Sequence, residues 1–257
     1  MDSRLLRAIG PATLVTVAVV VMVASLAYGG GAAPLVIADA GPVVRWGLPT
    51  TTLIFNLAAA GLLGSLILAL FALKAGDRAF DVALDVASVS AAVFTVAAGV
   101  TGFFTFIDAF NAQVTLGPEF GAQFGKFLTD TELGRAWLLT TVFGALLTVL
   151  TFAVRSWTGT FLVAILAIAA LVPVGTQGHS GEEANHNAAV MATVLHIEGA
   201  ALWLGGLLLL IVIRPLLPAE RMTTVLRRYS TIAIVAFVVV AASGYVRGVI
   251  GVVTWEA

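Results

Sequence analysis

The sequence predicts an all-α, polytopic transmembrane helix bundle of about seven spans, with the N-terminus in the cytoplasm. Hydrophobic residues make up 60% and charged residues 11% of the chain, whereas a soluble domain carries about 25% charged residues. The mean hydropathy is +1.06. Apolar runs of about 20 residues recur, and each can cross roughly 30 Å of hydrocarbon. Because backbone polar groups find no water in lipid, these runs are expected to be helical.

The spans follow one another without a soluble domain, so residues 1–257 are expected to form a single transmembrane domain in a lipid bilayer. Arg4 and Arg7 precede the first run, but no small-residue cleavage site follows it, so it is interpreted as a retained helix rather than a signal peptide. Residues 29–47 are rich in Gly and Pro and are assigned to a loop. The predicted spans are residues 9–28, 48–73, 84–110, 136–154, 158–174, 187–213 and 229–253.

Two spans and one connection carry further patterns. In the second span, Ala60-xxx-Gly64 and Gly61-xxx-Ser65 form small-residue faces suited to close helix contact. In the third span, Thr101, Thr105 and Asp108 share one face. Residues 111–135 are too polar to span. Within them, the helical spacing of Phe120, Phe124, Phe127 and Leu128 predicts a short amphipathic helix lying on the membrane interface.

The basic residues predict the orientation. Nine of them fall in segments on one side and three on the other, which by the positive-inside rule makes the richer side cytoplasmic. The opposite side collects acidic residues, which attract cations, although acidic loops are also ordinary solvated surface. The richer side holds Arg4, Arg7, Lys74, Arg78, Arg155, Arg214, Arg221, Arg227 and Arg228. The other holds Arg45, Lys126 and Arg135, with Asp39, Glu119, Asp130, Glu132, Glu182, Glu183 and Glu256.

All three histidines lie close together, at His179, His186 and His196, beside Glu182 and Glu183. If a helix begins near residue 187, His196 lies roughly 14 Å below the outer boundary, and about 15 Å separates it from His186. A metal–nitrogen bond is only about 2 Å, so these two histidines cannot share an ion unless the loop folds back. Two metal sites at different depths are therefore predicted. The outer histidines and an acid form a metal site at the mouth, and His196 forms a deeper one.

The helical wheel separates the polar residues of the sixth span. His196 shares its face with small residues and Trp203, whereas Glu198 points almost opposite and shares its face with Met191. A carboxyl group at this depth is costly unless paired or hydrated, which makes Glu198 a functional candidate. Asp108 and Arg247 are further ion-path candidates.

Each of these residues also has a plain structural interpretation. His179 and His186 fit solvated loop positions, and His196 fits a hydrogen bond across helices. Met191 and Trp203 fit packing. Arg247 fits an ion pair that holds the bundle together, with Asp108 or Glu198 as its partner.

Three segments resemble the copper resistance D (CopD/PcoD) family. They are TDTELGRAWLL at residues 129–139, GTQGHS running on to LHIEGAALWLGGLLLL at 195–210, and RRYSTIAIVAFVVVAASG at 227–244. The resemblance covers roughly the second half of the chain, and the first three spans match in hydropathy alone. His179, His196, Trp203, Gly205 and Gly206 correspond to family motifs, whereas His186 does not.

This resemblance implies copper handling at a bacterial inner membrane, usually described as copper uptake. It also implies an extracytoplasmic copper chaperone, or a fused or associated cytochrome oxidase assembly (CtaG-like) domain, as partner. The chain departs from the family in lacking Met- or His-rich outer segments. Family members commonly continue with another helix, so the sequence is expected to be a fragment or a short member that works with a partner.

The expected mechanism collects copper near His179 and binds it at His196. Asp108 and Glu198 compensate charge or couple protons, and Trp203 shields the inner side. The alternative is a copper-delivery or oxidase assembly factor that binds copper at the outer face without moving it. Haem is not expected, because bis-imidazole ligation needs two histidines on facing helices. A retinal protein is excluded by the lack of a lysine in the last span. No enzymatic activity and no nucleic-acid partner are expected, and no nucleotide-binding P-loop is present.

Overall fold

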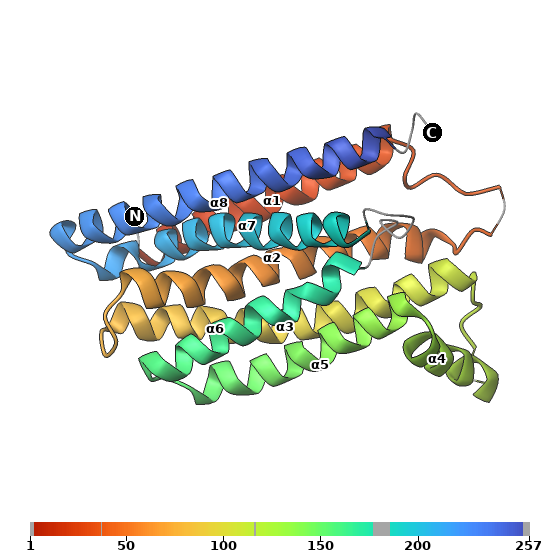
Figure 1. Ribbon diagram of the computed structural model, residues 1–257, viewed down its shortest axis with the longest axis horizontal. Coiled ribbons are helices and arrows are strands. Elements are labelled where there is room, and N and C mark those ends of the chain that lie inside the picture. The colour runs from red at the N-terminus through yellow and green to blue at the C-terminus, as the bar shows by residue number, and fades with distance from the viewer. Residues whose placement is uncertain (1–2, 37, 116, 177–185, 254–257) are drawn as a thin grey trace.

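The computed structural model describes residues 3–36, 38–115, 117–176 and 186–253, and in these ranges the chain is built from helices without strands (Figure 1). Long helices run the length of the molecule, and their connections gather at its two ends. The elements are α1 (Ser3–Tyr28), α2 (Pro42–Ala72), α3 (Arg78–Phe110), α4 (Pro118–Asp130), α5 (Glu132–Ala153), α6 (Trp157–Leu171), the 3₁₀ turn η1 (Val172–Thr176), α7 (His186–Ile213), the 3₁₀ turn η2 (Arg214–Leu216) and α8 (Ala219–Val253).

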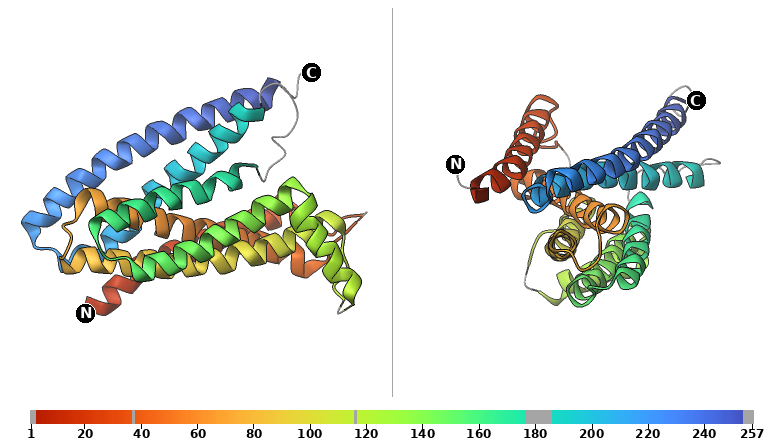
Figure 2. Two further views of the ribbon diagram at one scale, coloured as in Figure 1. Left: turned by 60° about the horizontal axis from the view of Figure 1, so that its bottom comes forward. Right: turned by 90° about the vertical axis from the view of Figure 1, so that its left-hand side faces the viewer.

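The predicted bundle of about seven spans is confirmed. In the described part, α2, α3, α5, α6 with η1, α7 and α8 are each long and apolar enough to cross a membrane, and α1 contributes a shorter apolar stretch, Ala12–Tyr28. Helix α1 lies at the margin of the bundle and exposes most of its side chains (Figure 2). The protein is therefore a multi-pass membrane protein whose central helices bury one another.

Several helices begin before the predicted spans. Helix α2 begins at Pro42 rather than at residue 48, because proline suits the first helical turn and Gly41, with φ of 86°, supplies the turn before it. Helices α3 and α8 begin about two and three turns before the expected spans, at Arg78 and Ala219. Hydropathy reports where apolar residues begin, and a helix continues into polar residues beyond the membrane.

Helix α2 is the centre of the bundle and packs through its predicted small-residue faces. A Cβ at Gly61 would meet the hydroxyl of Ser90 on α3, and one at Gly64 would overlap the backbone of Gly205 and Gly206 on α7. Every residue from Ala58 to Leu66 is buried. The backbone of α2 therefore approaches its two neighbours closely because no side chain separates them.

Helix α4 forms as predicted, but its aromatic face packs against α3 rather than lying free on the membrane interface. The ring centroid of Phe106 on α3 lies 5.2 Å from that of Phe124 and 5.5 Å from that of Phe127. Phe120 packs edge-on against Phe103 at 6.1 Å. The aromatic spacing indicated an amphipathic helix correctly, but periodicity alone does not distinguish a lipid surface from a protein surface.

The two ends of the bundle differ in charge. The end with the α2–α3, α5–α6 and α7–α8 connections, called the basic end below, holds Lys74, Arg78, Arg155, Arg214 and Arg221 (Figure 1). Two ion pairs connect its helices: Arg155 with Asp85 at 2.8 Å and Arg221 with Asp77 at 2.6 Å. The opposite end, called the α4 end, has an ion pair between Asp39 and Arg45 at 2.8 Å.

We expect Asp77→Asn to change stability little. The Arg221 and Asp77 side chains are both solvent-accessible, at 47% and 34% exposure, and such pairs contribute about 0.2–1 kcal/mol. The measurement is the midpoint of unfolding in a denaturing detergent titration. A destabilisation of several kcal/mol would contradict the weak role assigned to this pair.

Candidate functional site

The face of α7 that carries His196 packs against α8. A Cβ at Gly199 would meet Val240 and the Ala236 carbonyl oxygen, and one at Gly206 would meet the ring of Tyr229. The Tyr229 hydroxyl donates a hydrogen bond of 2.9 Å to the Trp203 carbonyl oxygen. Small residues on α7 thus let α8 approach closely around His196.

His196 is half-buried in this seam, and its Nδ1 lies 3.2 Å from the Val240 carbonyl oxygen and 3.3 Å from Ser243 Oγ. The carbonyl can only accept a hydrogen bond, and the Ser243 hydroxyl donates to the Val239 carbonyl at 2.6 Å. Both contacts therefore require a proton on Nδ1. In the neutral ring this leaves a lone pair on Nε2, which is the arrangement found in metal-binding histidines.

Trp203 lies on the same side of α7 as His196, two turns towards the basic end. Its ring packs edge-on against Phe237 of α8 at 5.8 Å, and 40% of the residue is exposed. Met191, one turn from His196 in the other direction, is 59% exposed and lines an apolar groove between α7 and α8.

Glu198 faces the other side of α7. It lines a pocket of about 190 Å³ with residues of α2, α6 and α8, among them Leu63, Ile67 and Ile168. Its Oε1 is buried and has no hydrogen-bond partner among the described residues. His196 and Glu198 thus lie on opposite sides of α7, as the helical wheel predicts.

The structural interpretation of Arg247, an ion pair with Asp108 or Glu198, finds no support in the described part of the chain. Arg247 and Asp108 are both exposed, and the ion pairs found there join other residues. For Asp108 the reason is the arrangement of the helices: α8 and α3 lie on opposite sides of the bundle, with α2 and α7 between them (Figure 1). Thr101 and Thr105, on the face of Asp108, bond to carbonyls of their own helix.

The predicted site at the outer mouth lies mostly outside the described residues. This holds for His179, Glu182 and Glu183, and His186 is described only as the first residue of α7, without its side chain. Within the described ranges, no three or more His, Asp or Glu side chains gather in a way that could hold a metal ion. The polar groups that meet His196 there are a carbonyl and a hydroxyl of α8.

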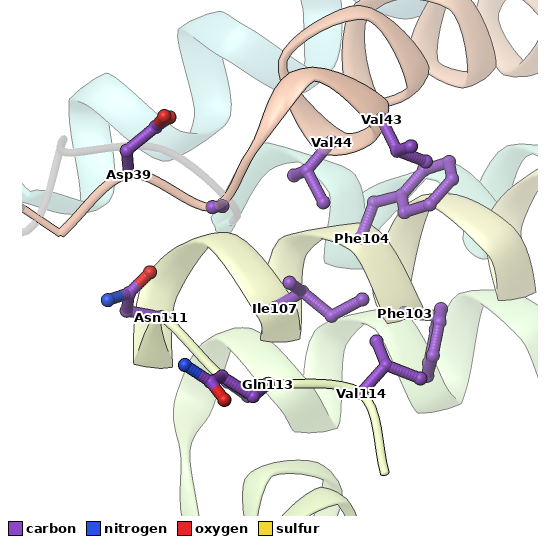
Figure 3. A pocket seen from close by; sticks show the side chains of 11 residues that line it. Asp39, Val43, Val44, Phe103, Phe104, Ile107, Asn111, Gln113 and Val114 are labelled. Atoms are coloured by element: carbon purple, nitrogen blue, oxygen red, sulfur yellow. The ribbon is translucent and has the colours of Figure 1, made fainter. Parts of the chain in front are cut away.

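Sequence reasoning missed a hollow of about 520 Å³ at the α4 end (Figure 3). Val43, Phe103, Phe104 and Ile107 contribute apolar walls, and the side chains of Asp39, Asn111 and Gln113 add polar groups. The hollow lies between the start of α2 and the end of α3. These segments are distant in sequence, and no spacing within either one predicts it.

One comparison with known proteins gives a match. Residues 37–189 match the family described as copper resistance protein D-like, N-terminal domain, which covers more than half of the chain. The chain belongs to this family. No curated protein and no solved structure matches it.

The extent of the match differs from that of the resemblance seen in the sequence. In this copper resistance D-like protein the match begins before α2 and includes α2 and α3. In the sequence, these two spans resembled the family in hydropathy alone. It ends at residue 189, so His196, Trp203, Gly205 and Gly206 lie beyond it, whereas His179 and His186 lie inside. The family assignment thus rests on α2 to α6, and the role of His196 rests on its geometry and on the motif resemblance.

Proposed function

We propose that this protein moves copper ions across the membrane and that His196 is the copper ligand within the bundle. The observation that carries this proposal is the hydrogen bonding of Nδ1 to Val240 and Ser243, which leaves Nε2 free to bind. Imidazole suits copper. Membership of the copper resistance D-like family supports copper as the substrate.

The direction proposed is uptake, from the α4 end towards the basic end. By the positive-inside rule the basic end is cytoplasmic, and the α4 end carries Asp39, Glu119, Asp130 and Glu132, which raise the local concentration of cations. A copper-carrying protein outside the membrane would be the source of the ion. The sequence has no nucleotide-binding P-loop motif, and the proposal is that copper moves down its gradient or with a second ion.

The test is copper accumulation in proteoliposomes with His196→Gln. The glutamine amide can still donate to the Val240 carbonyl, which preserves the contact between α7 and α8, but it has no imidazole lone pair. We expect accumulation to fall by at least about 10-fold to 100-fold, since losing even a hydrogen-bond partner of a metal ligand typically costs that much. The matched control is Leu207→Ala, which removes an exposed side chain of the same helix.

Two outcomes decide between the candidate functions. Accumulation equal to wild type in His196→Gln would contradict the transport role of His196. Wild-type protein that binds copper but never accumulates it, while cells lacking it lose oxidase activity, would favour the copper-delivery or oxidase assembly factor. Direct metal analysis of the purified protein and of His196→Gln shows whether copper binding itself depends on this residue.

A further inference from the structure

Asn56 is an exposed polar residue near the middle of the central helix α2. It lies 14 residues from Pro42, about 21 Å along the helix axis, and therefore deep in the membrane. The residues that follow it on the same face are almost fully buried: Ala59 is 2% exposed, Ala60 1% and Leu63 3%. This face of α2 is therefore directed at other helices, and the described part of the chain leaves it uncovered at Asn56.

The same face of α2 leads to Glu198. Leu63 and Ile67 follow Asn56 at i+7 and i+11, a spacing that places all three side chains on one side of the helix. Both line the pocket that Glu198 enters from α7 and Ile168 from α6. Glu198 lies 12 residues from the start of α7, about 18 Å along its axis. Gly64 of α2 lies against Gly205 of α7, and Asn56 precedes the first by eight residues and Glu198 the second by seven, so the two polar residues are at similar depths.

Neither polar group has a protein partner in the described part of the chain. No hydrogen bond involves the Asn56 amide, and Glu198 Oε1 is buried without one. An unsatisfied amide in an apolar environment costs several kcal/mol. Water is the simplest partner for both groups, and the exposure of Asn56 gives it access.

We propose that Asn56 and Glu198 line a water-accessible route for a hydrated cation, which enters from the α4 end between α2, α6 and α7. Carboxylate and amide oxygens suit hard cations that retain part of their water. The Glu198 pocket is bordered by Val235, Ala236 and Val239 of α8, whereas the His196 ring meets Val240 and Ser243 of α8 from the other side of α7. The route is therefore distinct from the proposed copper ligand and does not depend on it.

The chain has no cysteine, so a single introduced thiol reports its own surroundings. The test compares Asn56→Cys with Ile54→Cys, which is at the same depth and 42% exposed but lines an apolar groove with Val93 and Val96 of α3. A membrane-impermeant, cationic methanethiosulfonate is added from the α4 end. Because the reactive thiolate forms in water and not in lipid, we expect Asn56→Cys to react at least about tenfold faster.

Thr52→Cys extends the test one turn outwards on the face of Asn56 and is expected to react at least as fast as Asn56→Cys. Labelling after denaturation must be equal for all three variants, which shows that each thiol is present and intact. Equal rates at Asn56→Cys and Ile54→Cys, whether both fast or both slow, would overturn the water-accessible route.

The cation is tested separately. Replacing choline chloride outside the vesicles with potassium chloride at equal ionic strength is expected to slow labelling of Asn56→Cys about twofold, the effect of half-occupancy. An unchanged rate would remove the cation from the proposal. Neither measurement uses copper, so failure of the proposed copper transport leaves both results interpretable.

Discussion

Gly205→Ala is expected to destabilise the bundle by about 3 kcal/mol, as overpacking of a tight contact does. A Cβ at Gly205 would overlap the Ala60 carbonyl oxygen, and it would also approach Gly64 Cα at 3.0 Å. All of these neighbours are backbone atoms, which cannot rotate away as a side chain would. Helices α2 and α7 must therefore move apart, and the pocket that holds Glu198 between them changes with them.

The matched control is Gly248→Ala on α8, where a Cβ would meet nothing within 4 Å. Alanine favours a helix over glycine by about 1 kcal/mol, so this variant should be as stable as wild type or slightly more stable. The measurement is the detergent-unfolding midpoint together with the yield of monodisperse protein. If both variants lose the same stability, close backbone contact at Gly205 is not what holds α2 to α7.

Phe106→Ala is expected to release α4 from the bundle. Phe106 is fully buried, and its ring contacts Phe110, Phe120, Phe124 and Phe127 at 5.2–5.6 Å. Removing a buried phenylalanine costs about 3–5 kcal/mol. Half of the aromatic contacts across the α3–α4 interface would be lost together, while the contacts between the membrane-spanning helices would be largely preserved.

Limited digestion with trypsin measures this release, because Lys126 lies within α4. A loss of about 3 kcal/mol in local stability should raise cleavage there about 100-fold. Phe152→Ala is the control, since Phe152 is 56% exposed on α5 and its removal leaves no cavity. Unchanged cleavage in Phe106→Ala would show that the aromatic cluster does not hold α4 in place.

The membrane bundle follows from composition because lipid allows few solutions. A chain with 60% hydrophobic and 11% charged residues must satisfy its backbone within helices, and this requires no knowledge of which helices touch. The opposite faces of His196 and Glu198 also follow from sequence, since their relation is set within one helix. The small residues Gly61 and Gly64 also indicated close packing, because the face that they share is set within one helix.

Contacts between helices did not follow from sequence. An ion pair between Arg247 and Asp108 was one interpretation of these two opposite charges in the sequence. The order of the helices places α8 and α3 on opposite sides of the bundle. The polar partners of His196 are a carbonyl and a hydroxyl of α8, and a backbone carbonyl carries no sequence signal. The burial of the residues that follow Asn56, and the pocket around Glu198, likewise depend on how the helices pack.

The sequence by itself determined that this is a multi-pass helical membrane protein, which polar residues lie deep in it, and which of them share a helix face. Only the tertiary structure decided that α4 covers α3, that His196 is held by α8, and that Glu198 enters a pocket lined by α2, α6 and α8. The physical reason is that hydropathy and helical periodicity are local properties. The partners of a side chain depend on how helices distant in sequence pack, which is decided by backbone contacts such as that between Gly64 and Gly205.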